Sequence, residues 1–128
     1  MEAGDSVAPM ATTPGYSAAL TVSGPLVFVS GQVPVAADGS VAEGDAAEQT
    51  RQVFRNIELA LAGQQARMDQ IVKLTFFLCR IGDLAEVRAA RDEFITREPR
   101  PTSSLVEVSR LIDPRFLVEI EAVASLGP

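Results

Sequence analysis

Apolar residues recur along the chain with two different periods, and these periods predict the secondary structure. Short apolar and β-branched runs between turn residues predict five strands, at 17–22, 26–31, 71–78, 103–108 and 116–124. Apolar residues at helical spacing predict one helix that begins after Asp45 and ends at Gly63. A second helix is expected to be capped by Asp83 and ended by Arg97–Pro101. The predicted order of elements is ββαβαββ.

This order of elements predicts an α+β domain. The first two strands are expected to form a hairpin around Ser23–Pro25. A small sheet with both helices on one face is the simplest way to bury the apolar side of every element. Residues 1–13 are rich in Ala, Thr, Gly and Pro and predict a flexible N-terminal arm, so residues 14–128 are expected to form a single domain.

The strand predicted at Ile71–Leu78 carries apolar residues on both of its faces. Two helices that pack on one side of a sheet cannot cover both. The other face is therefore either buried by another subunit or left as a large apolar patch, which monomeric proteins rarely expose. We expect the protein to be an oligomer.

Composition and charge exclude several functional classes. Eleven Lys and Arg residues against seventeen Asp and Glu residues give a net charge of −6, which disfavours nucleic acids and anionic membranes as partners. The chain has no histidine, which removes His-dependent catalytic triads and nearly all zinc sites. No spacing typical of metal ligands is present, so no metal is expected. The single cysteine and the lack of a signal peptide or a long apolar run favour a cytoplasmic location.

Two carboxylates on the last predicted strand are candidate acid–base groups. Glu119 and Glu121 share one face of this strand, while Val118 and Ile120 share the other. A carboxylate among apolar neighbours can have a raised pKa and can act as a general acid or base. The alternative is that both glutamates are solvated or paired with a nearby arginine such as Arg115.

A second group of candidates lies at the ends of other strands. Ser30, Gly31 and Gln32 close the second predicted strand with a hydroxyl, a glycine and an amide. Such a strand end can offer donors to a small anion or a carbonyl, although it is equally compatible with a plain strand terminus. On the fourth predicted strand, alternation is expected to place Ser103 on the same sheet face as Glu119.

Several short motifs share their order and spacing with a known family. They are Pro-Gly-Tyr-Ser at 14–17, Ser-Gly-Gln-x-Pro at 30–34, Val-Lys at 72–73 and Glu-Ile-Glu-Ala at 119–122. From about Tyr16 to Ala124 the chain thereby resembles the reactive intermediate deaminase family (RidA, also called YjgF). This resemblance implies a chorismate-mutase-like α+β fold, assembly as a homotrimer, small-molecule clefts between subunits and no cofactor.

The resemblance also implies an activity and a set of site residues. Archetypal members hydrolyse reactive enamines and imines, such as 2-aminoacrylate, to 2-oxo acids and ammonia. Carried over by motif, Glu119 helps to position the attacking water, while Tyr16 and Ser30 shape the pocket. The expected substrate-binding residues are Tyr16, Ser30, Gly31, Gln32 and Ser103.

The chain departs from the family pattern at the arginine that grips the substrate carboxylate. The arginine of the motif Pro-Ala-Arg falls on Ser103. Hydrogen bonds to charged groups contribute roughly 1.5–3 kcal/mol each, so the loss of this contact costs on the order of tenfold or more in binding or rate. The resemblance therefore implies weak 2-imino acid deaminase activity, unless another arginine such as Arg100 or Arg115 replaces it. On the second helix, Arg88 and Arg91 stand where the family often has Asn and Tyr.

Three functions remain in competition. The first is an enzyme that processes an imine, an enamine or a related reactive compound, with Glu119 as the catalytic group. The second is a non-catalytic, small-molecule-binding or regulatory trimer. The third, RNA cleavage, has been attached to the family, but the net charge of −6 and the absence of histidine argue against it here.

Overall fold

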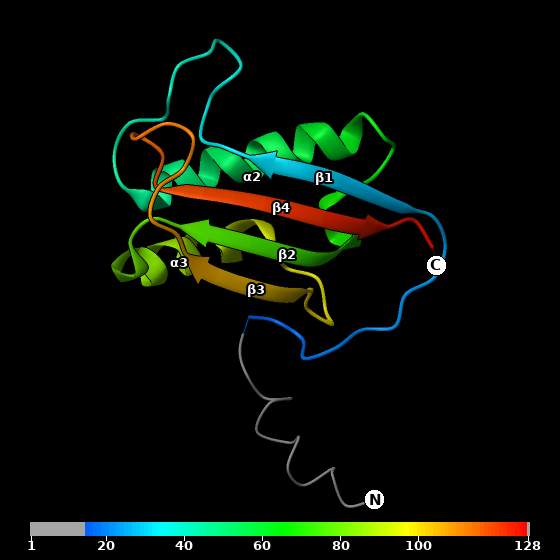
Figure 1. Cartoon of the computed structure of the whole chain (residues 1–128). Coiled ribbons are helices and arrows are strands. Elements are labelled where there is room, and N and C mark those ends of the chain that lie inside the picture. Colours follow the sequence, from blue (N-terminus) through cyan, green and yellow to red (C-terminus); the bar gives the residue numbers. More distant parts are fainter. Residues whose placement is uncertain (1–14, 128) are drawn as a thin grey trace, which may run out of the picture.

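The computed structural model describes residues 15–127, and it confirms the α+β class (Figure 1). The strands are β1 (Leu26–Gln32), β2 (Ile71–Leu78), β3 (Thr102–Glu107) and β4 (Val118–Ser125). The helices are α2 (Ala46–Ala62) and α3 (Leu84–Phe94), with short 3-10 helices at Met68–Gln70 and Ile81–Asp83. The predicted N-terminal arm, residues 1–13, lies outside the described residues.

The four strands form one mixed sheet in the order β1-β4-β2-β3. Strand β4 runs antiparallel to both β1 and β2, and β2 runs parallel to β3. Strands β1 and β3 are therefore the two edges of the sheet. Both helices lie behind the sheet in the view of Figure 1, so one sheet face is covered and the other is open.

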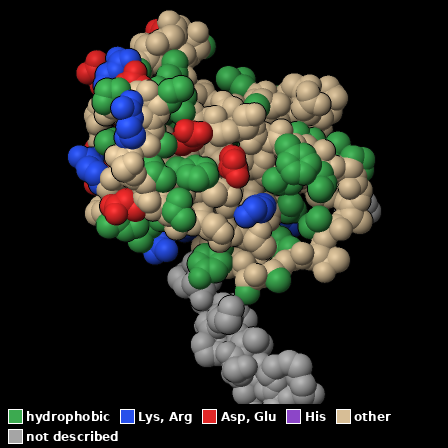
Figure 2. Space-filling view, viewed as in Figure 1, with side chains coloured by type: hydrophobic (Ala, Val, Ile, Leu, Met, Phe, Trp, Pro, Cys, Tyr) green, Lys and Arg blue, Asp and Glu red, His purple; other side chains and the backbone are tan. Residues whose placement is uncertain are grey.

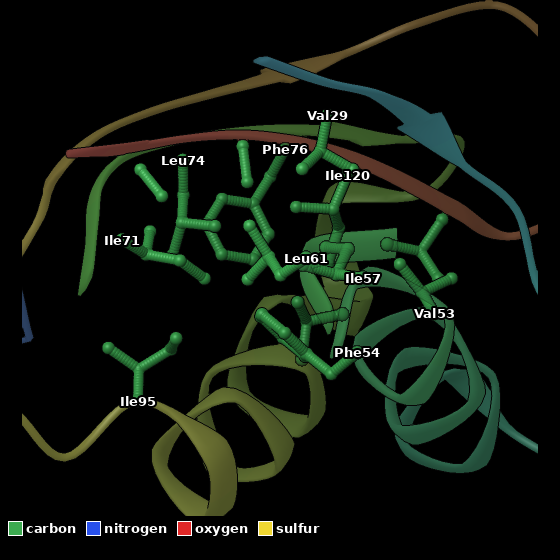
Figure 3. Packing of buried hydrophobic residues seen from close by; sticks show 14 of the residues in the cluster. Val29, Val53, Phe54, Ile57, Leu61, Ile71, Leu74, Phe76, Ile95 and Ile120 are labelled. Carbon is green, nitrogen blue, oxygen red and sulfur yellow. The ribbon is translucent and has the colours of Figure 1, made fainter. Parts of the chain in front are cut away.

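The core fills the space between the sheet and the helices, as the periodic apolar residues predict. In α2 the side chains of Val53, Phe54, Ile57 and Leu61 are fully buried. The ring of Phe54 stacks on Phe94 of α3 at 5.3 Å and meets the ring of Phe76 of β2 edge-on at 6.3 Å. Figure 3 shows Phe54 and Ile57 between the helix and the strands. These contacts fix α2 and α3 against the same side of the sheet.

The predicted start of each helix and the predicted end of α2 are confirmed. The carboxylate of Asp45 accepts a hydrogen bond from the backbone N–H of Glu48 at 3.0 Å, which caps α2, and Gly63 follows its last residue. Asp83 directly precedes α3, but its carboxylate accepts a hydrogen bond from Nε of Arg80 at 3.0 Å and caps no backbone N–H. The expected side-chain cap at Asp83 is therefore wrong.

The strand expected at residues 17–22 does not form, and neither does its hairpin with β1. Ser17 makes a single bridge to Thr102 at the β3 edge, where its N–H donates to the carbonyl of Pro101 at 3.0 Å. Leu26, nine residues later, pairs with Ser125 of β4 next to the opposite edge. Because the segment between them has to cross the width of the sheet, it cannot also run alongside β1 (Figure 1).

The face of the sheet that the helices leave uncovered, called the open face below, carries both apolar and charged side chains. Phe28 is 75% exposed, Val106 is 47% exposed and Leu26 is 46% exposed. Figure 2 shows this face, where hydrophobic, acidic and basic side chains lie together over the strands. No helix of the described part of the chain is long and apolar enough to cross a membrane.

Candidate functional site

Glu119 lies half-buried on the open face of β4, beside a bulge in β1. The register between β1 and β4 shifts between Val29 and Gln32, so Ser30 and Gly31 both lie opposite Glu121. The backbone of Gly31 approaches the side chain of Glu119 so closely that a β-carbon at Gly31 would lie 2.9 Å from Cδ of Glu119. The absence of a side chain at Gly31 therefore makes room for the carboxylate.

Two buried or half-buried side chains of α2 fix the strand ends around this carboxylate. The amide of Gln49 donates to the carbonyl of Arg115 at 2.9 Å and accepts from the N–H of Leu117 at 2.7 Å, which holds the entry to β4. The amide of Asn56 donates to the carbonyls of Val33 at 2.9 Å and of Val35 at 3.0 Å, which holds the exit from β1. Glu119 and its β1 neighbours thus lie on a backbone anchored to a core helix.

The surroundings of Glu119 are apolar on one side. Phe77 of β2 is its direct cross-strand partner. Within residues 15–127, no Lys or Arg lies within 4.0 Å of its carboxylate. Arg115 instead pairs with Asp113 at 2.8 Å, and Arg110 donates to the carbonyl of Leu111 at 3.1 Å. The structure therefore does not support the alternative in which Glu119 is paired with an arginine.

The other residues of the β1 end differ in their exposure. Ser30 is exposed, and Gln32 is half-buried with its amide donating to the carbonyl of Ser30 at 3.1 Å. We call Ser30, Gly31, Gln32 and Glu119 the β1–β4 half-site. The structure thus brings four of the six predicted site residues to one end of β1 and β4.

Ser103 lies on the opposite side of the sheet from Glu119, so the expectation that they share a face is wrong. In the parallel register, Ser103 pairs with Leu74 and Leu105 pairs with Phe76, and both partners are buried in the core. Val106, the next residue after Leu105, lies on the other face of β3 and is exposed. Leu105, Val106 and Val108 are all apolar, so the sequence of this edge strand does not define its inner face, and a one-residue shift reverses every side chain.

Ser103 and Tyr16 line a small cavity between α3 and β3, called the α3–β3 pocket below. Its volume is about 240 Å³. Ser17 donates hydrogen bonds to the carbonyls of Arg100 and Pro101, just before the start of β3, and this brings Tyr16 to the pocket. Two arginines of α3, Arg88 and Arg91, complete its polar lining. The apolar part of the lining consists of Phe76, Leu84, Val87 and Leu105.

Neither arginine that sequence reasoning offered as a replacement lines this pocket. Arg100 donates from Nε to Glu98 at 3.0 Å and from Nη1 to the carbonyl of Ile95. Arg115 is held by Asp113, and its side-chain and backbone hydrogen bonds lower the pKa of that carboxyl to about 2. Arg88 and Arg91 occupy the pocket instead, and the sequence marked them only as departures from the family pattern.

Within one chain the sheet separates the two groups of candidate residues. Glu119 and the bulge at Ser30 and Gly31 lie on the open face near the β1 edge, while Gln32 pairs with the buried Ile120; the α3–β3 pocket lies on the helix side at the β3 edge. Among the described residues, no group of three Cys, Asp or Glu side chains could hold a metal ion. The two groups can meet only if they come from different chains.

Comparisons with known proteins identify the family of the chain. The model of the family described as Endoribonuclease L-PSP matches residues 6–126. A RutC family protein of Pyrococcus abyssi is 38% identical over 111 residues, which cover 85% of this chain and 84% of that protein. The 2-iminobutanoate/2-iminopropanoate deaminase of Salmonella typhimurium is 38% identical over 105 residues, which cover 79% of this chain and 80% of that enzyme.

A solved structure shows the same fold. The crystal structure of a conserved Rid-family protein of unknown function from Yersinia pestis has a TM-score of 0.79 and 30% identity, and the match covers 88% of this chain and 87% of that one. With the family model spanning nearly the whole chain, the chain belongs to the YjgF/RidA (Endoribonuclease L-PSP) family.

Proposed function

We propose that the protein hydrolyses an imine, an enamine or a related reactive intermediate in a cleft between two subunits. The observation that carries this proposal is the environment of Glu119. Its carboxylate is half-buried between Gly31 and Phe77 and has no cationic partner in the described part of the chain. Such a group is available to accept a proton from a water molecule.

The proposed cleft joins the β1–β4 half-site of one subunit to the α3–β3 pocket of the next. Because the two surfaces differ and lie at opposite edges of the sheet, the interface between them is heterologous, and a heterologous interface that closes forms a ring. The partly apolar open face, with Phe28, Leu26 and Val106 exposed, supports burial against other subunits. The proposed ring is a homotrimer, in agreement with the family resemblance.

The proposed reaction needs only water and two proton transfers. The water oxygen adds to the imine carbon, while Glu119 takes a proton from this water and passes it to the nitrogen. The C–N bond of the resulting carbinolamine then breaks, and the hydroxyl proton moves to the departing nitrogen. The products are a carbonyl compound and ammonia, so the proposed reaction consumes no cofactor.

Ser103 limits the proposed activity on the shortest 2-imino acids. We expect the protein to release ammonia from 2-iminopropanoate and 2-iminobutanoate about tenfold or more slowly than the Salmonella deaminase, because the strand arginine is missing. The measurement uses imines generated in situ by an amino-acid oxidase, with both proteins assayed in parallel. A rate equal to that of the Salmonella enzyme would contradict this reading of Ser103.

The alternative is a small-molecule-binding or regulatory trimer without catalysis, which the replacement of the family arginine by Ser103 favours. An imine loss no faster than the uncatalysed rate would support this alternative. RNA cleavage has less support, because the net charge of −6 opposes binding to a phosphate backbone. The proposed partners are thus other copies of the chain and a small molecule, with the cytoplasm as the proposed location.

A further inference from the structure

We propose that Arg88, with Arg91 beside it, binds a carboxylate group of the ligand in the α3–β3 pocket. A helix would then supply the positive charge that Ser103 cannot supply from β3. The inference rests on the proposed function only in assuming that this pocket is part of the ligand site.

All four polar residues that line the pocket carry hydrogen-bond donors on their side chains. These are the hydroxyls of Tyr16 and Ser103 and the guanidinium groups of Arg88 and Arg91, and no Asp or Glu lines the cavity. The whole chain has a net charge of −6, but the residues that line this pocket include two positive charges and no negative one. A pocket lined in this way is suited to binding an anion.

The two arginines differ in how firmly they are held. Arg91 is buried, lies 2.9 Å from Asp92 and packs its guanidinium against the backbone of Gly15. Arg88 is exposed, and no carboxylate of residues 15–127 lies within 4.0 Å of it. Arg88 is thus the cation that has no anionic partner within the described chain.

The spacing of the two arginines strengthens the case for a bound anion. Residues three apart on a helix are neighbours on one face, so Arg88 and Arg91 place two like charges side by side at the pocket. Asp92 already pairs with Arg91 at 2.9 Å, so the unpaired charge that a ligand carboxylate would meet is that of Arg88. The volume of about 240 Å³ lies below the range typical of drug-sized ligands, so the pocket fits a small metabolite.

A carboxylate-binding arginine on α3 instead of on β3 would also affect catalysis. A short 2-imino acid would be held by its carboxylate from a different wall of the pocket, which displaces its imine carbon from the attacking water. A misplacement of about 1 Å can reduce a rate by about 10²-fold. Such a ligand would bind well and react slowly.

Binding measurements with a matched pair of probes test the inference. Isothermal titration calorimetry compares 2-oxobutanoate with its uncharged amide, 2-oxobutanamide, on the wild-type protein and on Arg88→Gln. We expect the wild type to prefer the carboxylate by about tenfold or more, and Arg88→Gln to lose this preference. Arg55→Gln is the control, because Arg55 is an exposed arginine of α2 outside the pocket and its loss changes the net charge equally.

Equal affinity of the wild type for the two probes, or an unchanged preference in Arg88→Gln, would overturn the inference. A preference lost equally in Arg55→Gln would overturn it too, since the effect would then follow net charge alone. Turnover plays no part in this test. A protein that shows the Arg88-dependent preference and hydrolyses no imine would therefore retain this inference and refute the proposed enzymatic function.

Discussion

The replacement Glu119→Gln is expected to lower the turnover of an imine substrate by roughly 10²–10⁴-fold, the range typical of losing a general acid–base group. Glutamine keeps the shape of the side chain and one acceptor oxygen, but it cannot take a proton from water. Because Glu119 has no ion pair in the described structure, its loss breaks no salt bridge. The oligomer mass and the melting temperature should therefore change little. Ammonia release measures the effect.

Glu121→Gln is the matched control for this experiment. Glu121 is on the same face of β4, but it is exposed, and its cross-strand partner on β2 is Thr75 instead of Phe77. We expect this variant to keep the turnover of the wild type. An active Glu119→Gln protein together with an inactive Glu121→Gln protein would show that the wrong carboxylate has been assigned.

A methyl group at position 31 is expected to reduce turnover by about 10²-fold without removing any polar group. In Gly31→Ala the new β-carbon would overlap the carboxylate of Glu119. That carboxylate is the free end of a flexible side chain, so it moves aside while the backbone keeps its path. Displacement of a catalytic group by about 1 Å is sufficient for an effect of this size. Turnover and melting temperature are measured together.

Gly82→Ala provides the control for a glycine replacement of the same kind. A β-carbon at Gly82 meets no atom within 4 Å, so this variant should match the wild type in both measurements. Wild-type turnover in Gly31→Ala would show that the carboxylate position is not critical. A large loss of melting temperature in Gly31→Ala would show instead that the bulge serves stability.

Local sequence signals predicted most of the fold because they act over short distances. The cap at Asp45, the end of α2 at Gly63 and the strand at Ile71–Leu78 are all where the periodicity placed them. The segment at 17–22 was predicted to be a strand but does not form one. Its apolar pattern is compatible with a strand, but its path is set by the anchoring of Ser17 at the β3 edge, which no local pattern encodes.

The candidate site was predictable to the extent that it follows from alternation in well-defined strands. The pattern of β4 placed Glu119 on the face away from the core, and the structure confirms that placement. Ser103 was assigned to the wrong face because Leu105 and Val106 are both apolar, and only the register with β2 decides which of them turns inward. Arg88 became a site candidate only when the structure set α3 against β3.

The central claim is that the candidate residues form one site only between subunits. Light scattering coupled to size-exclusion chromatography tests it most directly, because the sheet separates the two half-sites within a single chain. A homotrimer has three times the chain mass of 13.6 kDa, about 41 kDa, and we expect this mass over a wide range of concentrations. A monomer mass of 13.6 kDa would contradict both the proposed assembly and the proposed intersubunit site.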